Sequence, residues 1–113
     1  MSRRGEVLLW VAQRLTAGVL GVCVLVHLAT IIYAVRGGLT AAEILGRTRG
    51  NVAWASFYVI FVMAVAVHGT IGLRTIAAEW LGFRGRAAEV VMVLVGVGLA
   101  LLGLRAVVAV FGA

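Results

Sequence analysis

The sequence is poor in charged residues and has almost no cysteine. Of its 113 residues only 12% are charged, four of these are acidic, and there is no proline. The one cysteine, Cys23, excludes an internal disulfide bond and leaves the redox compartment undetermined. In contrast, 64% of the residues are hydrophobic and the mean hydropathy is +1.15. A soluble domain of this size could not bury so much apolar surface, so the composition predicts an all-α protein embedded in lipid.

All ten basic residues are arginine, and the net charge is +6. On a soluble protein this excess would indicate nucleic-acid binding. Here the arginines lie at the edges of apolar spans, which is the charge pattern of membrane topology, so we expect the lipid bilayer and no nucleic acid as a partner. Six lie at the N-terminus and in the second connection (Arg3, Arg4, Arg14, Arg74, Arg84, Arg86), and four on the other side (Arg36, Arg47, Arg49, Arg105). This difference favours a cytoplasmic N-terminus and a C-terminus outside.

Three apolar segments are long enough to cross a bilayer. They cover about residues 10–35, 52–76 and 87–111. The first has a charge-free stretch from Leu15 to Val35, which as a helix is about 31 Å long. The residues before it should form a basic tail, because Arg14 interrupts the apolar run that a signal peptide requires. The sequence therefore predicts one domain, residues 1–113, with three transmembrane helices in a larger helical bundle.

The two connections between these spans have recognisable local signals. Thr40, followed three residues later by Glu43, forms a capping box and predicts one or two helical turns over residues 41–45. This short helix should lie at the membrane surface, with Arg47 beyond it in water. The second connection, residues 75–86, combines aromatic and basic side chains with two glycines that allow a turn.

A histidine lies near the end of the second apolar span. His68 is followed by a step of small residues that includes Gly69 and Gly72, and Arg74 comes six positions after the histidine. A histidine inside an apolar span is costly unless its ring nitrogens are used, and glycines beside it leave room for a flat, bulky group. Arg74 lies where a lipid-buried helix would meet water. This pattern is typical of a haem ligand on a membrane helix.

A second histidine, His27, lies in the first span at a different depth. If Arg14 and Arg74 both mark the inner boundary, helical rise places His27 about 20 Å deep and His68 about 9 Å deep. Two ligands of one iron must lie at nearly one level, because each Fe–N bond is only about 2 Å long. The depths therefore favour two haems, each completed by a histidine from another chain.

Two stretches of the sequence resemble a known family. They are QRLTAGV (residues 13–19) and HGTIGLRTIAAEW (residues 68–80), and they accompany three spans in a chain of this length. Over about residues 8–111 the chain resembles the cytochrome b anchor subunit of succinate dehydrogenase/fumarate reductase. The resemblance implies a multi-pass subunit of the inner (cytoplasmic) membrane that carries haem b and binds quinone. It also implies an iron–sulfur subunit beside the anchor and a flavoprotein subunit docked on that subunit.

The resemblance also suggests roles for single residues. His68 matches the haem ligand of the second helix. Arg14 matches the arginine near the quinone and a haem propionate, and Arg74 matches the position that faces the inner haem edge. Gln13 and Thr16 are candidates to donate hydrogen bonds to a quinone carbonyl.

His27 departs from the members with one haem, which lack a ligand histidine in the first helix. It resembles the members with two haems, in which the first helix supplies the outer haem and the second helix the inner one. With three spans, this chain would be half of such a unit. The partner is then either a second copy, with His27/His27 and His68/His68 pairs on a two-fold axis, or a different anchor chain.

Several alternatives stay open. The chain has no nucleotide-binding glycine motif, no cysteine cluster and no catalytic carboxylate pair, so it would be a non-flavin subunit of a succinate:quinone oxidoreductase. It could also be a haem-free quinone-binding anchor whose histidines only bond across helices, or a small proton-conducting subunit. Glu43 could accept a proton from a quinol. Arg105 either extends to the outer interface or pairs with an outer propionate, and Cys23 is most simply a small packing residue.

Overall fold

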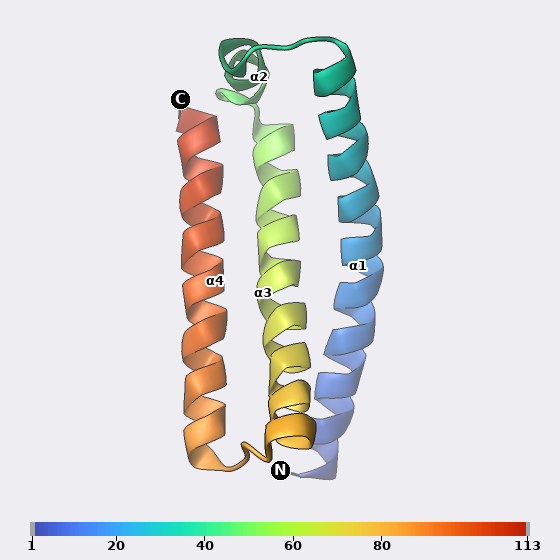
Figure 1. Ribbon diagram of the computed structural model, residues 1–113, viewed down its shortest axis with the longest axis vertical. Coiled ribbons are helices and arrows are strands. Elements are labelled where there is room, and N and C mark those ends of the chain that lie inside the picture. The colour runs from blue at the N-terminus through green and yellow to red at the C-terminus, as the bar shows by residue number, and fades with distance from the viewer. Residues whose placement is uncertain (1, 113) are drawn as a thin grey trace.

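The computed structural model describes residues 2–112 and shows an all-helical chain (Figure 1). Its helices are α1 (Arg3–Arg36), α2 (Ala41–Thr48), α3 (Val52–Leu81) and α4 (Arg86–Gly112). Three of them, α1, α3 and α4, are long and apolar enough to cross a membrane. The all-α fold with three candidate spans is therefore confirmed. The two ends of the chain lie at opposite ends of the bundle (Figure 1).

Helix α1 begins well before the apolar span. The predicted basic tail is instead helical from Arg3, because Ser2 caps the helix by accepting a hydrogen bond from the Gly5 backbone N–H at 3.1 Å. Glu6 lies in the first turn, where a negative charge is favoured by the helix dipole. At about 51 Å the helix is longer than the hydrocarbon layer is thick, so part of it extends beyond that layer or the helix is tilted.

The short helix α2 is fixed at both of its ends. The predicted capping box is confirmed, because Thr40 Oγ1 accepts from the Glu43 N–H and the Glu43 carboxylate accepts from the Thr40 N–H. At the other end, Thr48 Oγ1 donates to the Val110 carbonyl oxygen and the Gly50 N–H donates to that of Phe111, both at 2.9 Å. These two bonds satisfy carbonyls that the end of α4 would leave unpaired. The helix is thus attached to the C-terminal end of α4.

Helix α3 extends further than predicted. It continues to Leu81, so most of the second connection is helical and only a short loop joins α3 to α4. Gly82 ends the helix in the left-handed conformation, with φ of 65°, and Gly85 has φ of 94°. These backbone angles require glycine and confirm that the two glycines make the turn.

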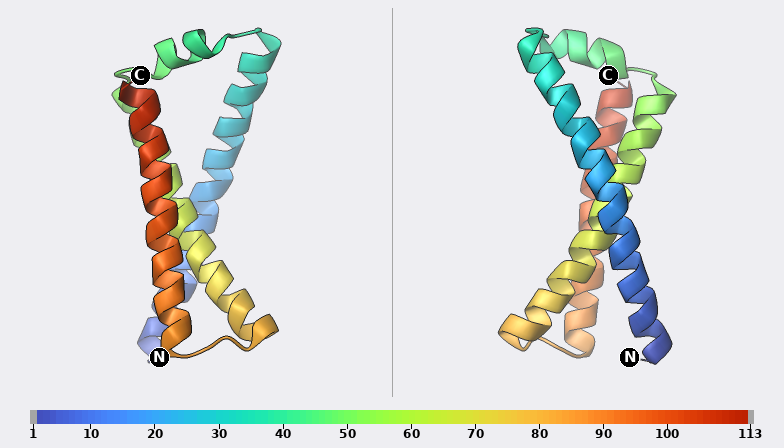
Figure 2. Two further views of the ribbon diagram at one scale, coloured as in Figure 1. Left: turned by 60° about the vertical axis from the view of Figure 1, so that its left-hand side comes forward. Right: turned by 90° about the vertical axis from the view of Figure 1, so that its right-hand side faces the viewer.

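The central helix is α3, which packs against α1 on one side and α4 on the other. Figure 2 shows that α1 and α3 cross, and that α3 and α4 diverge towards the loop that joins them. The residues at the contacts are small: Cys23 is 4% exposed, Ala64 is 6% exposed, and no large side chain of the described residues is fully buried. The role of Cys23 as a small packing residue is confirmed. Large apolar side chains cover the outer faces and are suited to lipid or to another chain.

Candidate functional site

Both histidines lie in the contact between α1 and α3. The Nδ1 atom of His68, on α3, is 3.2 Å from Thr16 Oγ1 on α1. The Nδ1 atom of His27, on α1, is 3.1 Å from the hydroxyl oxygen of Tyr58 on α3. Each ring is half-buried. Each histidine ring therefore faces the other helix of the pair and contacts a hydroxyl group on it.

These two contacts fix how far apart the histidines lie along the bundle. Thr16 lies eleven residues before His27 on α1, and Tyr58 lies ten residues before His68 on α3, so the two pairs are separated by about 15 Å along the helices. The sequence-based difference of about 10 Å is too small. That estimate assumed that Arg14 and Arg74 lie at the same level, and this assumption was wrong. The Thr16–His68 contact places Arg14 level with about residue 70, so Arg74 lies about one helical turn nearer the end of the bundle than Arg14.

The contact between Thr16 and His68 also determines which ring nitrogen carries the proton. A hydroxyl group has one hydrogen, and that of Thr16 is directed at the Ala12 carbonyl oxygen, 2.7 Å away. Thr16 Oγ1 is then the acceptor for the His68 Nδ1–H. The other ring nitrogen, Nε2, is left with its lone pair, which is the form of imidazole that binds a metal. The phenol of Tyr58 has no second acceptor among the described residues and does not fix His27 in this way.

The surroundings of His68 leave a polar atom unpaired and have little side-chain bulk. Gln13 lies one turn before Thr16 on α1, and its side-chain oxygen is buried without a hydrogen-bond partner. A Cβ atom at Gly72 would lie 3.5 Å from the Gln13 side-chain nitrogen, and one at Gly69 would lie 3.8 Å from Leu99. Gly72 therefore faces α1, the helix that also carries Thr16, whereas Gly69 faces α4. The structure brings Gln13, Thr16, His68 and Gly72 together, a grouping that their separate motifs did not predict.

The two arginines singled out from the sequence are placed differently. Arg14 is exposed, and its guanidinium carbon lies 5.3 Å from the centre of the Trp10 ring. Arg74 donates from Nε to the Glu89 carboxylate at 2.7 Å, so it joins α3 to the first turn of α4. Both lie near the His68 end of the bundle. Within residues 2–112, neither forms a hydrogen bond to His68 or Thr16.

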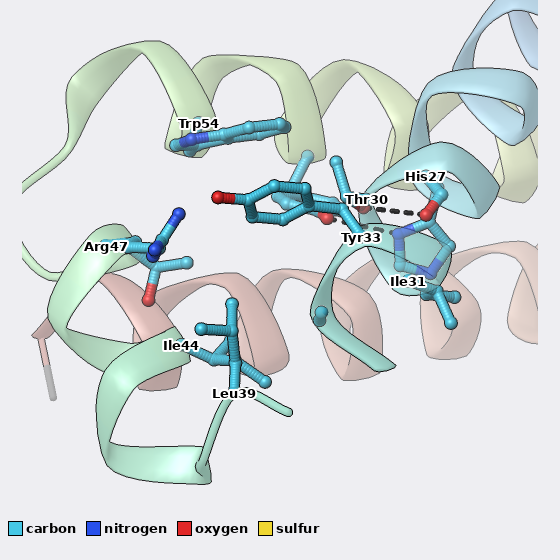
Figure 3. A pocket seen from close by; sticks show the side chains of 11 residues that line it. His27, Thr30, Ile31, Tyr33, Leu39, Ile44, Arg47 and Trp54 are labelled. Carbon is cyan, nitrogen blue, oxygen red and sulfur yellow. Dashed lines mark hydrogen bonds between the residues drawn. The ribbon is translucent and has the colours of Figure 1, made fainter. Parts of the chain in front are cut away.

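A cavity of about 330 Å³ lies beside His27, between α1, α2 and the start of α3 (Figure 3). Its walls are mainly apolar and aromatic and include Tyr33 and Trp54, and Arg47 lies at the end away from the histidine. The ring of His27 meets the rings of Tyr58 and Phe61 edge-on, each with centroids 5.6 Å apart. The complete lining is His27, Thr30, Ile31, Tyr33, Ala34, Leu39, Ile44, Arg47, Thr48, Trp54 and Tyr58.

Sequence reasoning missed this cavity because its residues were interpreted one at a time. Arg47, for example, was expected to lie in water beyond the short helix. A usable signal was the spacing of His27, Thr30 and Ala34, which places them on one face of α1. The position of α2 over that face could not be read from spacing.

Neither histidine is part of a cluster that could hold a metal by itself. In residues 2–112 there is no group of three or more His, Cys, Asp or Glu side chains suited to a metal ion. Each histidine can therefore offer one ligand to a metal whose other ligands come from elsewhere. A tetrapyrrole iron, which needs only axial ligands from protein, has this requirement.

Three helices that are long and apolar enough to cross a membrane define the class, which is a multi-pass membrane protein. Comparison with protein families gives the particular one: residues 1–104 match the succinate dehydrogenase/fumarate reductase transmembrane subunit, and the chain belongs to this family. The match covers α1, α2, α3 and most of α4. No curated protein and no solved structure gives a significant match. The family places the chain in a complex with other subunits at a membrane.

Proposed function

We propose that this chain is the haem b- and quinone-binding anchor of a succinate:quinone oxidoreductase in the cytoplasmic membrane, with its N-terminus on the cytoplasmic side. In this role it passes electrons between an iron–sulfur subunit and the quinone pool. The succinate chemistry takes place on a flavoprotein subunit. Family membership supports the assembly, and the residues around the two histidines support the cofactor and the substrate.

The observation that carries the proposal is the state of His68. Metal-bound histidines use one ring nitrogen for the metal and donate the other N–H to a fixed acceptor. In this protein the acceptor is Thr16 Oγ1, whose own hydrogen is used by Ala12, so Nε2 of His68 is free to be an axial ligand. Gly72, one turn after His68 on the same face of α3, faces Gln13 on α1 and adds no side chain there. The residues present therefore fit a haem, which when bound supplies reversible one-electron chemistry.

His27 is the proposed ligand of a second haem. Its ring lines the cavity between α1, α2 and the start of α3, here called the outer cavity, and the Tyr58 hydroxyl group bonds its Nδ1 atom. The two histidines are about 15 Å apart along the helices, so they cannot share one iron. Each needs a second axial ligand from another chain, either a second copy or a different anchor subunit. The apolar outer faces of α1 and α4 leave room for such a partner.

The quinone is proposed to bind at the His68 end, beside Gln13, Thr16 and the exposed Arg14. The buried side-chain oxygen of Gln13 has no partner, although a buried acceptor without a hydrogen bond is costly. A quinol hydroxyl is a donor that would satisfy it, and the Gln13 NH₂ group can donate to a quinone carbonyl. Arg74 is paired with Glu89 at the edge of the same end and contributes positive charge there.

A difference spectrum of the purified complex tests the haem proposal. His68→Ala should remove the inner haem from the dithionite-reduced minus oxidised spectrum. The flavoprotein should still oxidise succinate with an artificial electron acceptor, because its site lies outside this chain. His27→Ala is the matched variant and should remove only the outer signal. Haem content that is unchanged in both variants contradicts the proposal.

A haem-free quinone-binding anchor is the second candidate. The observation that favours it is that both histidines already bond across α1 and α3, which by itself explains why they are retained in an apolar bundle. It predicts a wild-type complex that reduces quinone but has no α-band in the same spectrum.

A further inference from the structure

The outer cavity has a histidine at one end and an arginine at the other. His27 comes from the C-terminal half of α1, and Arg47 comes from the last turn of α2 (Figure 3). Between them the walls are aromatic and aliphatic, with Tyr33 and Trp54 facing the space. A ligand that filled this cavity would have an apolar, flat body, and one end of it would meet a guanidinium group.

The position of Arg47 is fixed by the fold. Thr48, the next residue, donates its hydroxyl to the Val110 carbonyl oxygen at 2.9 Å, and Gly50 donates its N–H to that of Phe111. These bonds attach the end of α2 to the end of α4. The guanidinium carbon of Arg47 lies 5.4 Å from the centre of the Tyr33 ring, which is a cation–π distance. Helix α2 therefore holds a positive charge at the end of the cavity rather than merely connecting two spans.

Among residues 2–112 this positive charge has no acidic partner. Within residues 2–112 the one ion pair is Arg74–Glu89, at the other end of the bundle, and no residue lining the cavity is acidic. The guanidinium group has five N–H donors, and none of them makes a hydrogen bond within the described residues. A cation beside an apolar cavity is best satisfied by an anionic oxygen group on whatever occupies the cavity.

We propose that Arg47 binds the propionate carboxylate of the haem whose axial ligand is His27. This inference rests on the proposed function, because it takes a haem at His27 as given. It assigns α2 to the outer cofactor site and gives Arg47 the role of a binding residue. It also decides against Arg105, the other candidate considered for an outer propionate, because Arg105 is exposed on α4 and does not line the cavity.

The experiment compares Arg47→Leu with Arg49→Leu in the purified complex, using redox titration of the two haem signals. The two variants remove the same charge from the same side of the bundle, but Arg49 does not line the cavity. A nearby cation stabilises the reduced haem, so Arg47→Leu should lower the midpoint potential of the outer haem and leave that of the inner haem unchanged. Arg49→Leu should leave both midpoint potentials unchanged. Arg47→Lys keeps the positive charge and should keep the potential of the outer haem close to the wild-type value.

A second readout measures how firmly the outer haem is held. Loss of a charge-assisted hydrogen bond should speed transfer of the outer haem to excess apomyoglobin by on the order of tenfold in Arg47→Leu. Equal midpoint potentials and equal transfer rates in the Arg47→Leu and Arg49→Leu variants overturn the inference. If His27→Ala removes the outer signal in the same preparation, the proposed function survives that result. If His27→Ala changes nothing, the proposed second haem is absent and this inference fails with it, and His68→Ala then decides whether the rest of the proposed function stands.

A lipid phosphate has the same charge and oxygen chemistry as a propionate, so the lipid is varied as well. The titrations are repeated in nanodiscs of phosphatidylcholine alone and of phosphatidylcholine with phosphatidylglycerol. The propionate predicts the same difference between Arg47→Leu and wild type in both membranes. A difference that appears only with the anionic lipid assigns Arg47 to a lipid headgroup and overturns the inference.

Discussion

Helix α3 has two neighbours, and its two faces are built differently. Towards α4 the contact is made by small residues: a Cβ atom at Gly96 would lie 2.7 Å from Thr70 Oγ1, and one at Gly103 would overlap Val62. Towards α1 the contact contains two histidines and their hydroxyl partners. Among residues 2–112, a single hydrogen bond joins side chains of α3 and α4. It is the bond from Arg74 to Glu89, near the loop that connects the two helices.

The two faces of α3 therefore differ in their chemistry: one packs closely against α4, and the other carries polar groups towards α1. Glycine lets two helix backbones approach closely, and close packing holds helices together in lipid, where the hydrophobic effect between them is absent. The α3/α4 pair is therefore closely packed where Gly96 and Gly103 meet α3. The α1/α3 crossing is wider away from its centre (Figure 2) and carries the polar groups that can bind a cofactor. Changes on the two faces should therefore have separable effects.

The largest effect is expected from filling the α3/α4 contact. Gly103→Leu places a side chain where Val62 already lies, and overpacking of this kind costs about 1–3 kcal/mol. Gly98→Leu is the matched control, because a Cβ atom there has nothing within 4 Å. Thermal unfolding of the purified protein in detergent should show a lower midpoint for Gly103→Leu only. Equal midpoints for the two variants would mean that close packing at Gly103 does not stabilise the α3/α4 pair.

The next effect is expected on the other face, from Thr16→Val. This change removes the acceptor for the His68 Nδ1–H but keeps the side-chain shape, and loss of such a partner costs about 10–100-fold in metal-site affinity. The inner haem content per complex is the measurement. Thr75→Val is the control, since Thr75 also bonds a carbonyl of its own helix but is exposed and does not contact a histidine. Thr16→Ser should behave like wild type, and equal haem loss in the Thr16→Val and Thr75→Val variants contradicts the role given to Thr16.

A smaller effect is expected from Tyr58→Phe at the outer histidine. The variant loses the hydrogen bond to His27 but retains the ring, and the edge-on contact of His27 with Phe61 still holds the imidazole. We therefore expect less than about tenfold loss of the outer haem, with the inner signal unchanged. A larger loss than that in Thr16→Val would show that the outer histidine depends more on its hydroxyl partner than the inner one does.

The smallest effect is expected at the Arg74–Glu89 pair. Their side chains are 32% and 48% exposed, and ion pairs this open to solvent contribute about 0.2–1 kcal/mol. Arg74→Gln, Glu89→Gln and the double variant form a cycle that measures this coupling from thermal unfolding. A coupling well above 1 kcal/mol would mean that α3 and α4 are held by charge as well as by small residues.

The sequence predicted the parts of the protein that depend on local chemistry. The three spans, the capping box of Thr40 and Glu43 and the glycine turn after α3 could all be recognised. The roles given to His27 and His68 stay predictions. Lipid provides no hydrogen-bond partner for a backbone, so long apolar segments must be helices, and caps depend on residues three positions apart. Helix ends were less well predicted: Ser2 starts α1 early, and α3 continues to Leu81.

Only the tertiary structure decided which residues meet. Thr16 with His68, Tyr58 with His27, and α2 over the cavity are contacts between segments far apart in the sequence. They depend on how far one helix slides and tilts against the next, which is set by where small residues let the backbones approach. The amino-acid sequence by itself thus determined three membrane helices with two histidines. Helix packing then determined the partner of each histidine, because register between helices is a property of their contact surfaces.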